Sequence, residues 1–181
     1  MAVSTFSNSI LGANPRTLDV LPTVTGTGAP STLPFTPGFV ADGDNGGEWV
    51  YCKLTLAAVT SLLDGHVFTI DKDYNASLIA TANSPRGQRV GVGRVAAPNT
   101  AAGVYGLFVQ VGGQAPLQVV ATTPKGFTNM ETTATPGVLG SPTSSTVGSK
   151  FVAAVVIVAD NAGAAASVEA ILNWPSVDKT N

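Results

Sequence analysis

His66 is the only histidine in the 181-residue chain, so any Ser-His-Asp or Cys-His centre would have to be built on it. It begins an alternating, strand-like run that ends at Ile70, and the chain contains no Gly-x-Ser-x-Gly nucleophile elbow. The single cysteine, Cys52, also lies in a strand-like run, where a buried and reduced thiol is the simplest interpretation. We therefore expect no catalytic site, and a protein that is not an enzyme.

Two acidic turns carry the oxygen atoms that hard cations such as calcium prefer. Residues 42–48 read Asp-Gly-Asp-Asn-Gly-Gly-Glu, and residues 71–75 read Asp-Lys-Asp-Tyr-Asn. Neither turn has the complete spacing of a calcium-binding loop, and both also suit ordinary turns next to strands. We expect no cofactor and no metal ion, and the sequence leaves open whether the first turn binds a cation.

Two of the four arginines, Arg86 and Arg89, lie in one short turn that reads Pro-Arg-Gly-Gln-Arg. Arginine is favoured at protein interfaces, so this turn could contact a neighbouring subunit; an ordinary solvated loop is the equal alternative. The nine lysines and arginines are otherwise scattered along the chain without a basic stripe. We therefore expect no nucleic-acid partner.

The overall composition is poor in charge and rich in small apolar residues. Charged residues make up 11% of the chain and hydrophobic residues 44%, with a net charge of −2. Such a surface offers little self-repulsion, which indicates a subunit that functions in an assembly. The N-terminus does not read as a secretory signal, and the longest apolar run, residues 151–159, is about half the length of a membrane helix. We expect a soluble protein made in a reducing cytoplasm, without a membrane partner.

The elements that would position these residues are short strands. Residues 104–113 alternate as a half-buried strand, with Tyr105, Leu107, Val109 and Val111 on one face, and end on a glycine pair. A second glycine-bearing strand is predicted over residues 89–95. Glycine inside a strand marks a bend or a close approach of another group, so these glycines indicate tight packing within the fold or between subunits.

Further strands are predicted around residues 49–55, 66–70, 77–82, 117–122, 150–159 and 167–174, with a short helical turn at residues 59–63 and an end of the pattern at Pro175. No long helical period is present. The sequence predicts an all-β fold, a compact β-barrel or β-sandwich, that occupies residues 49–181.

Residues 1–48 form a different region. Four prolines between residues 22 and 37 exclude a regular helix or a central strand there. Large apolar residues are nevertheless frequent, which favours an extended, proline-rich arm that packs on another surface over the alternative of a disordered tail. The predicted interface residues are Phe6, Leu18, Leu21, Leu33, Phe35 and Phe39 of the arm, with Arg86 and Arg89 of the body.

The order of these motifs resembles that of the small β-rich virion proteins of tailed bacteriophages, among which are capsid decoration (cement) proteins. The resemblance covers about residues 40–175, and it rests on residues 44–51, 67–71, 87–93, 105–113, 132–138 and 173–175. It implies a structural protein that binds the outside of the capsid and bridges major capsid subunits. The implied partners are the major capsid protein and further copies of this chain, with a trimer preferred to a dimer, assembled in the host cytoplasm.

Two other functions stay open from the sequence. A tail-tube, head–tail connector or fibre-base protein would share the β-rich and charge-poor profile. A carbohydrate-binding adsorption module would need exposed aromatic side chains, for which Trp49 and Trp174 are the candidates.

Overall fold

The computed structural model describes residues 15–20, 33–43, 46–121, 123, 125–126, 129–141, 148–161 and 163–180. The predicted all-β fold is confirmed, and the described part contains a single helical turn, η2 (Thr81–Asn83). The strands are β1 (Asp19–Val20), β2 (Val40–Asp42), β3 (Glu48–Leu56), β4 (Thr60–Leu62), β5 (Val67–Ile70), β6 (Asn75–Leu78), β7 (Arg89–Gly93), β8 (Ala97–Thr100), β9 (Gly103–Val119), β10 (Asn129–Thr132), β11 (Leu139–Gly140), β12 (Lys150–Ile157) and β13 (Ala166–Thr180).

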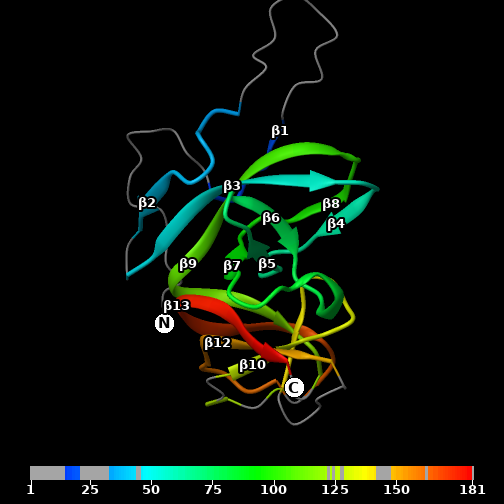
Figure 1. Ribbon diagram of the computed structural model, residues 1–181. Coiled ribbons are helices and arrows are strands. Elements are labelled where there is room, and N and C mark those ends of the chain that lie inside the picture. Colours follow the sequence, from blue (N-terminus) through cyan, green and yellow to red (C-terminus); the bar gives the residue numbers. More distant parts are fainter. Residues whose placement is uncertain are drawn as a thin grey trace, which may run out of the picture.

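The first half of the body is a small closed barrel. β3 pairs with the first part of β9, β9 with β7, β7 with β5 and β5 with β6, all antiparallel. β6 then pairs in parallel with β3, which closes the ring. These strands form the upper lobe in Figure 1, and a hairpin of β4 and β8 extends from its side. We call this ring the first barrel.

The second half closes in the same way. The second part of β9 pairs with β13, β13 with β12, β12 with β10 and β10 with β11. β11 returns to β9 through a parallel pair, Leu139 with Val119. This second barrel is the lower lobe in Figure 1, where β13, β12 and β10 are labelled. β9 therefore belongs to both rings, and the two barrels share one backbone segment.

Each barrel has its own apolar core, and the sequence pattern of β9 explains both. Tyr105, Leu107, Val109 and Val111 point into the first core, as the alternation predicts. Ala115, Leu117 and Val119 point into the second core. Gly113 lies between the two groups with φ +77°, a conformation that favours glycine. The predicted strand end at the glycine pair is wrong, because the glycines carry β9 from one barrel into the next.

The glycines of β7 are sites of close packing within the body. A Cβ on Gly91 would lie 2.8 Å from the carbonyl oxygen of Gln110, and a Cβ on Gly93 would lie 2.6 Å from Cε2 of Phe68. Both distances are too short for carbon atoms, so only glycine lets β7 approach β9 and the Phe68 ring.

Two local predictions are wrong. Residues 59–63 do not form a helical turn, because β4 pairs there with β8. The last strand does not end before Pro175 but continues to Thr180. The register between β12 and β13 slips near residues 173–175, from Val155 opposite Leu172 to Ala153 opposite Ser176. A proline is tolerated in such a bulge because no ladder hydrogen bond is required of it.

Candidate functional site

His66 does not have the geometry of a triad base. It is buried, and its Nδ1 accepts the backbone N–H of Leu63 at 3.2 Å. In a triad Nδ1 instead donates to a carboxylate. Burial lowers the pKa of His66, because the charged ring would lose its hydration. Cys52 is buried and free, as predicted, and burial raises its pKa to about 12.

The acidic turn at residues 71–75 uses its carboxylate for its own backbone. Asp71 accepts the N–H groups of Asp73 and Asn75 at 2.8 and 2.9 Å and the Asn75 side-chain amide at 2.9 Å. Burial alone would raise the pKa of Asp71, but these hydrogen bonds outweigh it and lower the pKa. The part of the chain that the structure describes holds no group of three His, Cys, Asp or Glu side chains arranged for a metal ion.

The turn at residues 42–48 is described only in part, since Asp44 and Asn45 lie outside the described residues. The carboxylate of Glu48 accepts the indole N–H of Trp174, which ties the end of this turn to β13. Whether this turn binds a cation is left as the sequence left it.

The N-terminal segment is seated on the outside of the first barrel. Trp49, Tyr51 and Phe108 project outward from β3 and β9 as a buried aromatic cluster. Leu33, Phe35 and Phe39 pack on this cluster, and Phe35 makes edge contacts with the rings of Tyr51 and Phe108 at centroid distances of 5.2 and 5.3 Å. We call this arrangement the aromatic seat.

Backbone pairing reinforces the seat. β2 pairs antiparallel with β3, Val40 opposite Val50, and the amide of Tyr51 donates to the carbonyl of Phe39 at 2.8 Å. Farther along β3 this cover stops, and the outward Lys53 and Thr55 are exposed. The segment thus explains why both faces of β3 are apolar at one end only.

A second contact holds residues 15–20. β1 pairs antiparallel with β9, Asp19 opposite Gly106, and Leu18 packs against the first core. The Tyr51 hydroxyl donates to the Asp19 carboxylate at 2.8 Å. A Cβ on Gly106 would overlap that hydroxyl, so glycine is required for the bond to form. Burial, followed by the bond to Asp19, raises the pKa of Tyr51.

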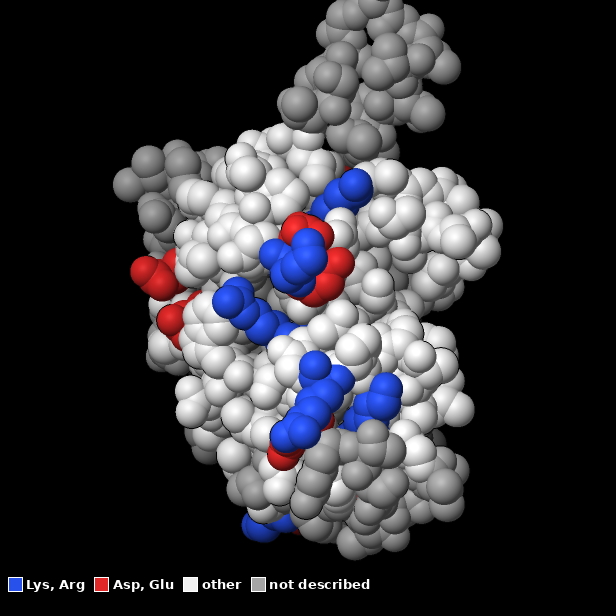
Figure 2. Space-filling model, viewed as in Figure 1, with Lys and Arg blue, Asp and Glu red and all other residues white. Residues whose placement is uncertain are grey.

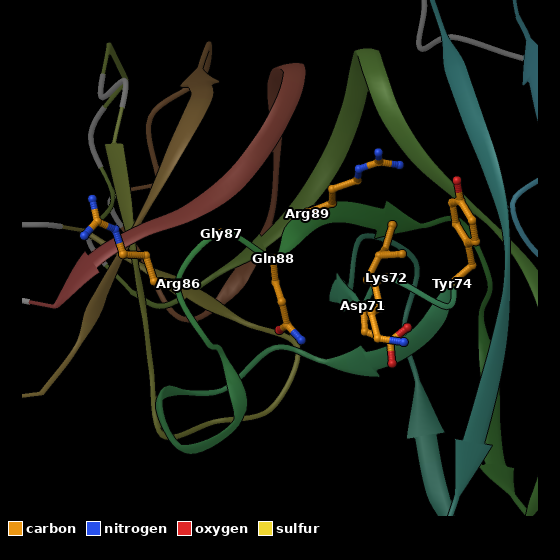
Figure 3. Close-up of a pocket in the computed structure, with 8 residues that line it drawn as sticks. Asp71, Lys72, Tyr74, Arg86, Gly87, Gln88 and Arg89 are labelled. Atoms are coloured by element: carbon orange, nitrogen blue, oxygen red, sulfur yellow. The ribbon is translucent and has the colours of Figure 1, made fainter.

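Arg86 and Arg89 line a groove with a volume of about 450 Å³ beside the start of β7. Figure 3 shows them at different places in it: Arg89 reaches toward Tyr74, whereas Arg86 lies at the other end and points away. The Arg89 guanidinium lies over two rings, 5.9 Å from the centroid of Tyr74 and 5.8 Å from that of Trp174. Figure 2 shows that Lys and Arg side chains are spaced over both lobes on this face, with broad uncharged surface around them.

The predicted interface residues fall into three groups. Phe6 and Leu21 lie outside the described residues. Leu18, Leu33, Phe35 and Phe39 pack on the chain's own first barrel, and Arg86 and Arg89 lie at the groove. Contact of any of them with another chain stays a prediction. Sequence reasoning missed the residues that receive them, above all Tyr51, Phe108, Tyr74 and Trp174, because outward aromatic residues on a strand do not reveal what covers them.

Of the two tryptophans proposed for sugar stacking, Trp49 is buried in the aromatic seat and Trp174 is 40% exposed. Within the described residues no helix has the length and apolar character to cross a membrane. Comparison of the sequence with protein-family models and with curated proteins finds no match.

Proposed function

We propose that the chain is a structural protein of a tailed-bacteriophage virion that binds the outer surface of the capsid. There it would stabilise the shell by bridging major capsid subunits, as a homo-oligomer for which a trimer is preferred. The observation that carries the proposal is the double attachment of the N-terminal segment, by strand addition and by an aromatic seat, to a body that has few charges.

This attachment is a suitable device for a coat-binding arm. Strand addition uses main-chain hydrogen bonds and makes few demands on sequence, so an arm of this kind can also pair with a neighbouring subunit. Each contact can be weak, because many copies on one lattice add their affinities. The sequence resemblance to phage virion proteins supplies the identity of the lattice, and assembly in the host cytoplasm follows from it.

The test is binding to shells of the phage that encodes the chain, prepared without this protein. We expect the full chain to cosediment with these shells at a fixed high stoichiometry and to raise their resistance to heating. A variant that lacks residues 2–14 keeps β1, β2 and the aromatic seat, and we expect it to fold normally and to bind less.

Cryo-EM of the intact virion gives the decisive observation. Density on the capsid exterior in hundreds of copies supports the proposal. Density in the tail or at the connector, in a few to a few dozen copies, would replace it with the other structural role. Equal occupancy of shells by the truncated and the full chain would remove residues 2–14 from the binding arm.

A further inference from the structure

The groove beside Arg89 contains a guanidinium without an acidic partner among the described residues. The two ion pairs in that part of the chain are Lys72–Asp73 at 2.7 Å and Arg94–Asp64 at 2.7 Å, and neither involves Arg89 or Arg86. A paired arginine elsewhere in the same body shows the contrast, since Arg94 is buried and makes two hydrogen bonds to its carboxylate. Arg89 is exposed and keeps its donors available.

The two aromatic rings hold the Arg89 guanidinium at the groove. Tyr74 comes from the turn between β5 and β6 of the first barrel, and Trp174 comes from the bulge of β13 in the second. Stacking on rings reduces the freedom of the side chain while its in-plane N–H groups stay directed outward. The site is therefore assembled from both barrels and is arranged before any ligand arrives.

The backbone at both rings is in an unusual conformation. Tyr74 has φ +58° and Trp174 has φ +49°, in the left-handed region that bulky residues rarely adopt. Such conformations cost free energy and persist where the surroundings fix them, and they are frequent at binding sites. The hydrogen bond from the Trp174 indole to Glu48 is one such constraint, and it also occupies that carboxylate.

The carboxylate that lines the groove is likewise occupied. Asp71 spends both oxygens on the amides of its own turn, and Asp73 pairs with Lys72. The groove therefore presents a net positive surface on a chain whose net charge is −2. An incoming acidic group would not have to displace an internal one.

The arrangement favours a carboxylate over a phosphate. Phosphate sites usually present several free backbone N–H groups. Here the N–H of Gly87 donates to Val177 and that of Gln88 donates to Pro85, so these donors are already used. A planar guanidinium matches a carboxylate with two parallel hydrogen bonds. The groove is also long enough to place Arg89 and Arg86 at different points, as an extended segment would require.

We propose that this groove binds an acidic peptide segment of a partner protein, with a carboxylate on Arg89 and the chain directed toward Arg86. The inference deepens the proposed function by giving the chemistry of the contact. It rests on that function only for the source of the segment, which would be a shell subunit.

The test follows the full chain by ¹⁵N NMR while the peptide acetyl-Ala-Glu-Ala-Glu-Ala-amide is added. We expect saturable shifts of the Arg89 Nε–H and Trp174 Nε1–H signals. The same peptide with Gln for both Glu should bind about tenfold or more weakly, because a charge-assisted pair is replaced by a neutral one. Affinity for the acidic peptide should fall as salt is raised, since the site is exposed.

Matched variants separate the site from general charge. Arg89→Gln should weaken peptide binding about tenfold, and Arg89→Lys should restore it only in part, because the two parallel bonds are lost. Lys125→Gln removes one positive charge from an exposed turn of the second barrel and should leave binding unchanged. Thermal unfolding of each variant checks that the fold is retained.

Three results would overturn the inference: equal binding of the Glu and Gln peptides, unchanged binding by Arg89→Gln, or the same signal shifts with inorganic phosphate at equal concentration. Absence of any saturable shift would do the same. The experiment contains no capsid, so its failure leaves the shell-binding result untouched. A chain found outside the capsid would equally leave a positive peptide result standing.

Discussion

The two barrels share strand β9 but are filled and covered differently. The second core consists of aliphatic side chains and Met130 and has no aromatic residue among its described members. The first core includes Phe68 and Tyr105, and three more aromatic residues cover its outer face as the aromatic seat. The second barrel is packed on one side of its strands, whereas the first is packed on both sides along part of β3 and β9.

The difference indicates how the molecule divides its work. The seat for the N-terminal segment and most of the groove residues belong to the first barrel or to the turn before β7. The second barrel contributes Trp174 through a bulge and otherwise forms a regular aliphatic core. We infer that the first barrel carries the contacts with other molecules and that the second braces it through β9 and β13.

The strongest way to break this comparison is to fill the space at Gly106. In Gly106→Val the new side chain would overlap the Tyr51 hydroxyl, which is buried between β9 and the N-terminal segment. We expect a loss of more than about 3 kcal/mol in the free energy of unfolding, because a buried ring bonded to Asp19 cannot move aside easily. Urea denaturation followed by far-UV circular dichroism measures it.

Gly163→Val is the matched control. Gly163 has open space around its Cβ position and lies in the second half of the chain. We expect a change within about 0.5 kcal/mol. Equal losses from the two substitutions would show that Gly106 is sensitive for a reason other than the aromatic seat.

A pair of core truncations on the shared strand asks whether the barrels unfold separately. Leu107 is fully buried in the first core and Leu117 is fully buried in the second. Each Leu→Ala change should cost about 3 kcal/mol through lost burial and a residual cavity. Because β9 runs through both rings, we expect one cooperative transition in both variants. Calorimetry that resolved two transitions, with only one shifted by each variant, would contradict the shared-strand account.

Much of the body could be predicted from the sequence, because alternation along β9 reports burial directly. The face of Tyr105, Leu107, Val109 and Val111 is as expected, and the glycines of β7 do mark close packing. The closure into two rings could not be predicted. It depends on long-range pairings, above all the parallel pairs β3–β6 and β11–β9, which leave no local signal.

The candidate sites were less accessible to sequence reasoning. The apolar residues of the N-terminal segment indicated packing on a surface, and the described ones do pack, on the chain's own first barrel. Arg89 could be singled out as a rare charge, but its neighbours Tyr74 and Trp174 lie 15 and 85 positions away along the chain. A turn residue and a bulge residue come together only in the folded molecule, so the groove had no pattern to read.

The smallest expected effect is also the most specific to the N-terminal segment. Tyr51→Phe removes the hydroxyl that donates to Asp19 and leaves the ring in the aromatic seat. We expect a loss of about 1 kcal/mol, the usual contribution of one hydrogen bond, and faster amide hydrogen exchange at residues 19–20. Tyr105→Phe is the control, since its hydroxyl bonds the carbonyl of Ala101 in the same barrel. It should cost a similar amount and leave exchange at residues 19–20 unchanged. If both variants accelerated that exchange equally, the bond to Asp19 would not be what fastens the segment, and the pairing of β1 with β9 alone would have to hold it.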